Sequence, residues 1–411
     1  MSLKDEGRHT VDGIMSNVQM KLSGRPWPPK VLAPASLDAS SIAVLSARLL
    51  LDLSPASTDA KGYEAELVRN HLRLLYSVQD DRRTIVTGSP PEPLVAEASA
   101  RIMHYHLDQE SYMDYWDLLR EFVDRGLAAQ GSIGELIGRA LSICAMDCAI
   151  NRLADSELSE LKYQTPVRVT DYYKALLTED AWDILRQSVP VNRARLSDES
   201  ATRTFEDAFK DAYLHFSHYG KANDDSSLMY AWALWLRGTA AVACQELGDR
   251  MAPIYFSKLG NVSPKTISVH LDQDKTGQNV NPNTVAMQSA ESLPTLFSDG
   301  NNLPYIVAVH CYALTKKQGI FVTMPNPYPH RDKIDGFEAP RYQINFRGLS
   351  AYGNITEGVK TSIRRMINQS KNVVFSYHPR EYGVPLLRRM LPVLTNDLES
   401  MEWFGADTGM V

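Results

Sequence analysis

The sequence lacks long hydrophobic runs. Its apolar stretches are broken by Arg or Gly within a turn or two, and none reaches the roughly 18 residues that suggest a membrane-spanning helix. The N-terminal segment carries Lys4, Asp5, Glu6 and Arg8, so it lacks the apolar core of a secretory signal peptide. We therefore predict neither a membrane span nor secretion.

Cysteine is also scarce, with 4 among 411 residues. Their number and scattered positions argue against a disulfide framework. Cys144 and Cys148 stand one helical turn apart in an apolar pattern, and no second Cys or His pair follows at zinc-finger spacing. We interpret them as structural thiols in a protein of a reducing compartment, the cytoplasm or the nucleus.

Several catalytic motifs are missing. The chain contains no GxxxxGK[ST], which disfavours a P-loop NTPase, and neither GxSxG nor HExxH. The formal net charge of −6 argues against a wholly basic nucleic-acid binder, although it says little about local patches.

One segment departs from this acidic balance. Residues 341–391 hold nine Lys or Arg against two acidic residues, with aromatic residues between them. Such a combination can follow a phosphate backbone of DNA or RNA. The predicted nucleic-acid contacts are Arg364, Arg365, Arg388 and Arg389. An amphipathic helix that pairs with acidic residues of the other domain is an equally open alternative.

The chain divides into three parts. Residues 1–38 include a Pro-rich stretch and are predicted to be an irregular tail. Helical spacing of apolar residues predicts a helical domain over 39–165. Within it, Ser132 and Glu135 have the spacing of a capping box that opens a helix.

The remaining residues, 166–411, are predicted to form an α/β domain, that is, a mixed α+β arrangement. Helices are expected over 170–187, 204–219 and 356–369, with a long buried segment over 227–247. Strands are expected at 252–256, 266–271, 305–310, 319–323, 341–346 and 372–376. Hydrophobic strands alternating with helices favour a mixed sheet with helical cover.

Distinctive motifs in both parts resemble those of a large group of uncharacterised proteins from mushroom-forming fungi (Agaricomycetes). They are SPPEPLVAEASARI at 89–102, HFSHY at 215–219, WLRGTAAVACQELGDRMAPIYF at 235–256, TISVHL at 266–271 and RYQINFRGLS at 341–350. By fold, that group is related to the PD-(D/E)xK nucleases and to the nuclease tails of Crinkler-type effectors. The resemblance implies a restriction-endonuclease-like fold for 166–411.

Nucleases of this kind hold Mg²⁺ with an acid at the start of one strand and an acid or Gln on the next. A Lys two positions later orients or activates the attacking water. Asp249 occupies the place of the first acid, whereas His270 and Asp272 occupy the expected Gln and Lys positions. Lys275 follows three residues late. The resemblance thus implies a catalytic set of Asp249, Asp272 and Lys275 and a Mg²⁺ or Mn²⁺ site of Asp249, His270 and Asp272.

The same residues have a simpler interpretation. Asp249, with Gly248, would end the long buried helix, and residues 272–275 would form a solvated turn. Similarly, Asp211, His215 and His218 would share one helix face, either as metal ligands or, in the favoured interpretation, as partly buried packing residues.

Because Asp272 stands where a Lys is expected, we expect a degenerate, inactive nuclease fold that binds nucleic acid or another partner, without a cofactor. Two alternatives stay open. One is an active metal-dependent nuclease that uses Mg²⁺ or Mn²⁺. The other is a protein-interaction scaffold whose basic segment serves an acidic protein partner.

Overall fold

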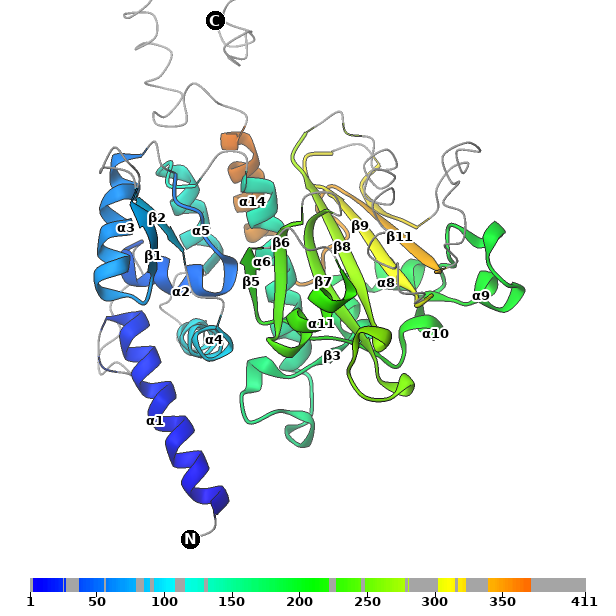
Figure 1. The fold of residues 1–411 in the computed structure, drawn as a ribbon. Helices are drawn as coiled ribbons and strands as arrows, with labels where there is room; N and C mark the ends of the chain where they lie inside the picture. The colour runs from blue at the N-terminus through cyan, green and yellow to red at the C-terminus, as the bar shows by residue number, and fades with distance from the viewer. Residues whose placement is uncertain are drawn as a thin grey trace, which may run out of the picture.

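The structure, a computed structural model, shows a mixed sheet with a group of N-terminal helices beside it (Figure 1). It describes residues 3–24, 26, 37–54, 57–78, 85–88, 92–107, 115–128, 132–221, 227–244, 248–277, 280, 302–314, 317–322 and 339–370. In these parts of the chain, no helix is both long and apolar enough to cross a membrane.

The first part is mainly helical, as predicted. Its helices are α1 (Leu3–Ser23), α2 (Ala39–Leu49), α3 (Thr58–Asn70), α4 (Pro93–Leu107), α5 (Tyr115–Asp124) and α6 (Ile133–Ile150). A short antiparallel hairpin, β1 (Leu74–Val78) and β2 (Ile85–Gly88), interrupts them, and the helical spacing of leucines had concealed it.

The prediction of an irregular tail over 1–38 is wrong for residues 3–23, which form α1. Met15 and Leu22 are each only 1% exposed and lie seven residues apart, two helical turns. Their side chains join the core, so this apolar stripe stabilises the helix. The Pro-rich stretch at 27–36 lies outside the described residues.

The predicted capping box of α6 is also wrong. Ser132 occupies the N-cap position, but its φ of −94° and ψ of 0° are helical values and its side chain makes no capping hydrogen bond. N-cap side chains normally reach the first free amides from an extended backbone. The side chain of Glu135 is therefore not engaged in a capping box.

A buried ion pair ties the helices together. Arg48 of α2 donates two hydrogen bonds to Asp147 of α6, at 2.6 and 2.7 Å, and His104 of α4 lies 2.9 Å from the same carboxylate. Burial alone would raise the pKa of Asp147, but the adjacent Arg48 guanidinium lowers it to about 2. The carboxylate is therefore charged and fully compensated.

The second part contains the sheet. Its helices are α7 (Val169–Leu176), α8 (Glu179–Arg186), α9 (Asp198–Thr202), α10 (Phe205–Phe209), α11 (Leu228–Leu236) and α14 (Glu357–Ser370). Its strands are β3 (Val167–Arg168), β4 (Ala212–Leu214), β5 (His218–Lys221), β6 (Thr239–Cys244), β7 (Gly248–Phe256), β8 (Ile267–Lys275), β9 (Tyr305–Cys311), β10 (Gly319–Phe321) and β11 (Arg341–Arg347).

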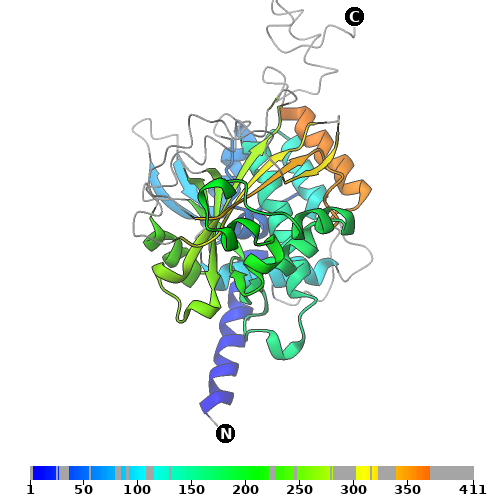
Figure 2. The same ribbon diagram turned by 90° about the vertical axis from the view of Figure 1, so that its right-hand side faces the viewer.

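The strand order is β10-β11-β9-β8-β7-β4-β3, and β6 and β5 extend from the side of β7. β7 and β8 are antiparallel, whereas β8, β9 and β11 run parallel to one another. Strands form in all five predicted segments from 252–256 to 341–346, and the mixed sheet is confirmed (Figure 2). The predicted strand at 372–376 lies outside the described residues.

Two predicted helices are wrong. The segment 204–219 contains the short α10 and then β4 and the start of β5. The long buried segment 227–247 divides into α11 and β6. Gly238 ends the helix with a φ of +57°, a left-handed conformation that glycine adopts readily. The residues after it then pair with β5 and β7.

β7 changes its neighbour part of the way along. On one side it pairs with β6 through Gly248, Arg250 and Met251, and later with β4 from Ile254 onward. Pro253, which has no backbone N–H, lies between the two partners. On its other side, β7 pairs with β8 along most of its length.

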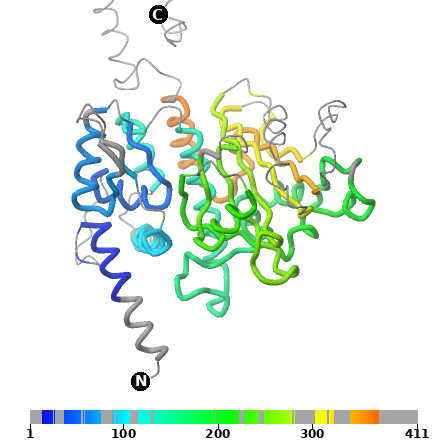
Figure 3. The backbone as a smooth tube through the Cα atoms, viewed as in Figure 1, coloured from blue at the N-terminus to red at the C-terminus, as the bar shows by residue number. Residues whose placement is uncertain are grey.

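Side chains alternate between two packed layers. One face of the sheet joins the large core that includes α6 and α7, through Ala252, Ile254, Ile306, Ala308, Ile344 and Phe346. The other face packs against α11 through Met251, Val269, Leu271, Val307 and Val309. α14 returns to the N-terminal helices and packs on α5 and α6 (Figure 3).

Candidate functional site

Asp249 and Lys275 meet where β7 begins and β8 ends. Arg250 pairs in register with Asp272, so the last residues of β8 lie beside the first residues of β7. Lys275 Nζ lies 3.2 Å from Asp249 Oδ2. The backbone N–H of Asp274 donates a 2.6 Å hydrogen bond to the same oxygen.

β8 continues to Lys275, four residues beyond its predicted end at 271. This corrects the simpler interpretation of both segments, because Asp249 lies in a strand rather than at a helix end and 272–275 are not a turn. It also places Gln273 and Lys275 two positions apart on the strand beside Asp249. The side chain of Gln273 lies close to the start of β7, since a Cβ added at Gly248 would be 3.5 Å from its Nε2 atom.

Glu135 approaches this site from the first turn of α6. The start of α6 lies on the end of β8, because a Cβ added at Gly134 would be 3.0 Å from Thr276 Cγ2 and 3.6 Å from the Asp274 carbonyl oxygen. Burial, and then the charge of Asp249, raise the pKa of Glu135. From the sequence, Glu135 was expected only as a capping residue; its place between Gly134 and Gly138 on an apolar helix was the available signal.

The Asp249 site, defined as Glu135, Asp249, Gln273 and Lys275, carries more negative than positive charge. Burial raises the pKa of Asp249, and the charge of Asp274 raises it further. Asp249 and Lys275 keep exposed side-chain fractions of 21% and 31%, so solvent reaches both. Each of the two half-buried acids therefore lies near another negative group, and Asp249 is paired with Lys275.

The structure does not bring Asp249, His270 and Asp272, the predicted metal trio, together in one group. Within the described ranges, no three His, Cys, Asp or Glu side chains form a group that could hold a metal ion. His270 and Asp272 do lie 3.3 Å apart, but both are buried in a different group of polar side chains. Of the predicted catalytic set, Asp249 and Lys275 lie together. Asp272 instead contacts Arg250 and His310.

That buried group surrounds Arg250 on the side of the sheet that faces α6. Arg250 donates to both carboxylate oxygens of Asp274, at 2.7 and 3.1 Å, and to Ser142 of α6 at 2.7 Å. Its Nη2 atom lies 3.5 Å from Asp272. We call this set the Arg250 cluster; its members are Arg250, His270, Asp272, Asp274 and His310.

Asp272 is fully compensated within the Arg250 cluster. His310 Nε2 lies 2.8 Å from its Oδ1 atom. Burial would raise the pKa of Asp272, but Arg250 and then His270 hold it well below its ordinary value. Tyr173 and Tyr352 hydrogen-bond the two histidines, at 3.0 and 2.7 Å. These contacts leave the Asp272 carboxylate a structural group.

The predicted nucleic-acid contacts fall on α14 or beyond it. Arg364 and Arg365 have exposed side-chain fractions of 51% and 58%. Arg365 lies 2.9 Å from Asp124 of α5, and Arg364 lies 4.0 Å from Glu357. Arg388 and Arg389 lie outside the described residues.

The expected helix face of Asp211, His215 and His218 does not exist, because Asp211 lies in the turn before β4, His215 lies between β4 and β5, and His218 begins β5. His215 Nδ1 lies 2.9 Å from the Trp235 carbonyl oxygen, and His218 lies between Ser217 and Thr239. The histidines are packing residues, as the favoured interpretation had it.

Cys144 and Cys148 are half-buried, free thiols on α6. A hydrogen bond between the two thiols lowers the pKa of Cys148 to about 7 and raises that of Cys144. The low value for Cys148 was not expected from an apolar helix.

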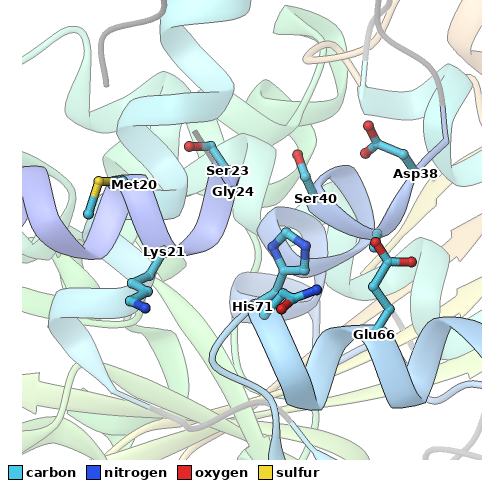
Figure 4. Close-up of a pocket in the computed structure, with 10 residues that line it drawn as sticks. Met20, Lys21, Ser23, Gly24, Asp38, Ser40, Glu66 and His71 are labelled. Atoms are coloured by element: carbon cyan, nitrogen blue, oxygen red, sulfur yellow. The ribbon is translucent and has the colours of Figure 1, made fainter. Parts of the chain in front are cut away.

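A polar pocket of about 470 Å³ lies among the N-terminal helices, lined by residues of α1, α2 and α3 and their ends (Figure 4). Its polar groups complete local structure: Asp38 accepts from the backbone N–H of Ser41 at the start of α2, and His71 Nδ1 lies 3.0 Å from the Leu22 carbonyl oxygen. None of the lining residues belongs to β7 or β8.

Comparison with known proteins gives one match. Residues 33–165 match a family described as a domain of unknown function (DUF8736). No curated protein and no solved structure matches the chain. The matched range includes Glu135 and ends before β7 and β8, so the Asp249 site combines one residue of the matched domain with three from the sheet.

Proposed function

We propose that this chain is a metal-dependent nuclease whose reacting groups are those of the Asp249 site. The observation that carries the proposal is the pairing of Asp249 with Lys275 at the adjoining ends of two strands, with Gln273 two positions before the Lys. An acid on one strand and Gln-x-Lys on the next is the arrangement implied by the resemblance to PD-(D/E)xK nucleases.

The expectation of an inactive fold depended on Asp272 replacing the Lys. Since β8 extends to Lys275, the pattern can be aligned three residues later, with Gln273 and Lys275 in the two functional positions. Asp272 and His270 then lie on the opposite face of the strand, where they are members of the Arg250 cluster. The reason for expecting inactivity no longer applies.

The donor set fits a hard divalent cation. Mg²⁺ prefers oxygen ligands, keeps several waters and is commonly held by only one or two carboxylates. Asp249 and Glu135 would supply carboxylates, and Gln273 would supply the oxygen of its side-chain amide. Burial raises the pKa of both carboxyl groups, and a neighbouring carboxylate raises it further, Asp274 for Asp249 and Asp249 for Glu135. A bound Mg²⁺ or Mn²⁺ would polarise the phosphate and make its water more acidic.

The side chains of the site have distinct parts in this proposal. The N–H of Asp274 and the ammonium of Lys275 both contact Asp249 Oδ2, which fixes the orientation of that carboxylate. Lys275 has three N–H donors; one holds Asp249, and the others can orient a water or offset charge that develops on a phosphate oxygen.

A cleavage assay tests the proposal. Wild-type protein with Mg²⁺ or Mn²⁺ should cleave single- or double-stranded DNA or RNA, and EDTA should stop the reaction. Lys275→Ala and Asp249→Asn should each lower the rate by about 100-fold or more, since each removes a group that acts on the reacting atoms.

The chain offers a matched control. Asp211 and Lys258 form another acid–lysine pair, 2.6 Å apart and more exposed, near the other end of β7. Asp211→Asn and Lys258→Ala should leave the rate unchanged. Absence of metal-dependent cleavage in the wild type, or equal rates in wild type and Asp249→Asn, would contradict the proposal.

We further propose that α14 contributes to nucleic-acid binding through Arg364 and Arg365. Two phosphate contacts on duplex DNA should give a slope of about −1.8 in a plot of the logarithm of affinity against the logarithm of salt. Arg364→Glu with Arg365→Glu should flatten that slope on every sequence alike. Fluorescence anisotropy at several salt concentrations measures it, and an unchanged slope would remove α14 from the interface.

A further inference from the structure

Asp274 lies between the two functional residues of β8, and its side chain is held on three sides. Arg250 donates two hydrogen bonds to its carboxylate, and the Tyr312 hydroxyl donates a third at 2.6 Å. The side chain is 0% exposed. A carboxylate held this tightly fixes the backbone that carries it.

The backbone of Asp274 in turn holds the site. Its N–H donates the 2.6 Å hydrogen bond to Asp249 Oδ2, and its sequence neighbours are Gln273 and Lys275. Because side chains alternate along a strand, the carboxylate points toward the core while its neighbours point the other way. The Arg250 cluster therefore contacts β8 on the face opposite to Gln273 and Lys275.

The same carboxylate also sets the position of α6. A Cβ added at Gly138 would lie 2.3 Å from Asp274 Oδ1, so only glycine permits this approach without a shift. Gly134, one turn earlier, lies against the Asp274 carbonyl oxygen, where an added Cβ would be 3.6 Å away. Glu135 follows Gly134, so the contact of α6 with Asp274 determines where Glu135 lies.

From these contacts we infer that Asp274 is a positioning residue: its buried side chain aligns Asp249 and Lys275 on the sheet and Glu135 on α6 as one cation-binding site. The inference rests on the proposed function, and it adds a specific dependence of the site on a residue that no substrate or cation would touch.

Asp274→Asn tests it in the full chain. The amide keeps the size of the carboxylate but cannot accept the same set of charged hydrogen bonds. We expect the Mn²⁺ affinity, measured by calorimetry or electron paramagnetic resonance, to fall about 10- to 100-fold, the range found when groups that orient metal ligands are removed. We also expect the backbone amide of residue 274 to exchange with deuterium faster in metal-free protein.

Asp272→Asn is the matched control. Asp272 is equally buried and also contacts Arg250, but among the described residues its contacts lie with the Arg250 cluster rather than with α6 or Asp249. It should lose stability as Asp274→Asn does while Mn²⁺ affinity changes less than about threefold, well below the effect of removing an orienting group. Equal losses of affinity in the two variants would overturn the inference, because the effect would then be general destabilisation.

Gly138→Ala provides a second variant that leaves every acid in place. It should weaken Mn²⁺ binding in the same direction, because its new methyl group must displace either α6 or the Asp274 carboxylate. Gly62→Ala in α3, where an added Cβ meets nothing within 4 Å, controls for the general effect of alanine in a helix. Unchanged Mn²⁺ affinity in Gly138→Ala would count against the inference.

The results also separate the two proposals. If the wild type binds Mn²⁺ and Asp274→Asn selectively weakens it, but no nucleic acid is cleaved, the positioning inference stands and the proposed function fails. If cleavage occurs and Asp274→Asn behaves as Asp272→Asn does, only the inference fails. A wild type that binds no Mn²⁺ overturns both.

Discussion

The Arg250 cluster and the Asp249 site are built on the same two strands but treat charge in opposite ways. In the Arg250 cluster, one guanidinium and two imidazoles surround two buried carboxylates, and the pKa of Asp272 falls well below its ordinary value. In the Asp249 site, two half-buried acids have raised pKa values, and Lys275 pairs with Asp249.

This difference separates a structural group from a functional one. A buried carboxylate that is fully compensated holds the fold together, and it needs nothing from solution. When the pKa of an acid rises on folding, its ionised form is less stable in the folded protein than in the unfolded chain. Residues with such shifted pKa values are candidates for binding or catalysis. The two sets differ in burial as well as in the balance of charge, because the Asp272 and Asp274 side chains are 5% and 0% exposed whereas that of Asp249 is 21% exposed.

The largest expected effect is the difference in stability lost when Arg250 or Lys275 is replaced. Arg250→Met would leave Asp272 and Asp274 buried without their guanidinium, so the free energy of unfolding should fall by about 3–5 kcal/mol. Lys275→Met removes a partly exposed partner and should cost only about 0–1 kcal/mol. Urea unfolding of both variants measures the difference, and similar losses would mean that the Asp249 site is as structural as the Arg250 cluster.

The second effect concerns pH. In metal-free protein the raised pKa values of Asp249 and Glu135 favour their protonated forms, so their contribution to stability is complete below the ordinary values of 3.8 and 4.5 and is lost as pH rises through the raised ones. Mn²⁺ requires the ionised forms. At about 100 times its Kd it should add about 2.7 kcal/mol of stability well above this range and nothing below it.

Thermal unfolding with and without Mn²⁺ across this pH range measures the effect. Asp147 provides an internal reference of opposite sign: its pKa of about 2 means that its contribution is present above 3.8 and lost as pH falls toward 2. A Mn²⁺ effect that persisted in acid below both ordinary carboxyl values would contradict the assignment of the cation to these acids.

The smallest effect sharpens the same contrast. Asp249→Asn removes one of two repelling acids while keeping an oxygen that can accept from the Asp274 N–H. We expect an unchanged or slightly increased stability at neutral pH, by at most about 1 kcal/mol, because the lost ion pair with Lys275 is partly exposed. A loss above that size, seen by urea unfolding, would show that Asp249 is needed for folding.

Much of the sheet could be predicted because its strands have strong local signals. The run at 305–310 is short and hydrophobic, and the run at 341–346 alternates polar residues with Tyr, Ile and Phe; both form strands. The end of β8 could not be predicted in this way, since Asp272, Gln273 and Asp274 are poor strand formers. Pairing with β7 and β9 extends the strand through them.

The ends of the helices likewise could not be predicted from local sequence signals alone. Residues 227–247 are apolar enough for one long helix, and only the tertiary fold shows that Gly238 divides them. Of the site, Asp249 and Lys275 were expected only from the resemblance to PD-(D/E)xK nucleases. Glu135 was missed because its approach depends on the packing of α6 at Gly134 and Gly138, a contact far apart in sequence.

The close approach of α6 to Asp274 also has a consequence for the timing of biosynthesis. Residues of α6 leave the ribosome long before Asp274, and the contact of Gly134 and Gly138 with Asp274 closes a long loop of chain that includes α7 to β7. The nascent protein therefore cannot assemble the Asp249 site until β8 has been made and has paired. If the site does cleave nucleic acid, the growing chain remains harmless to the messenger and the ribosome that are producing it until the sheet is nearly complete.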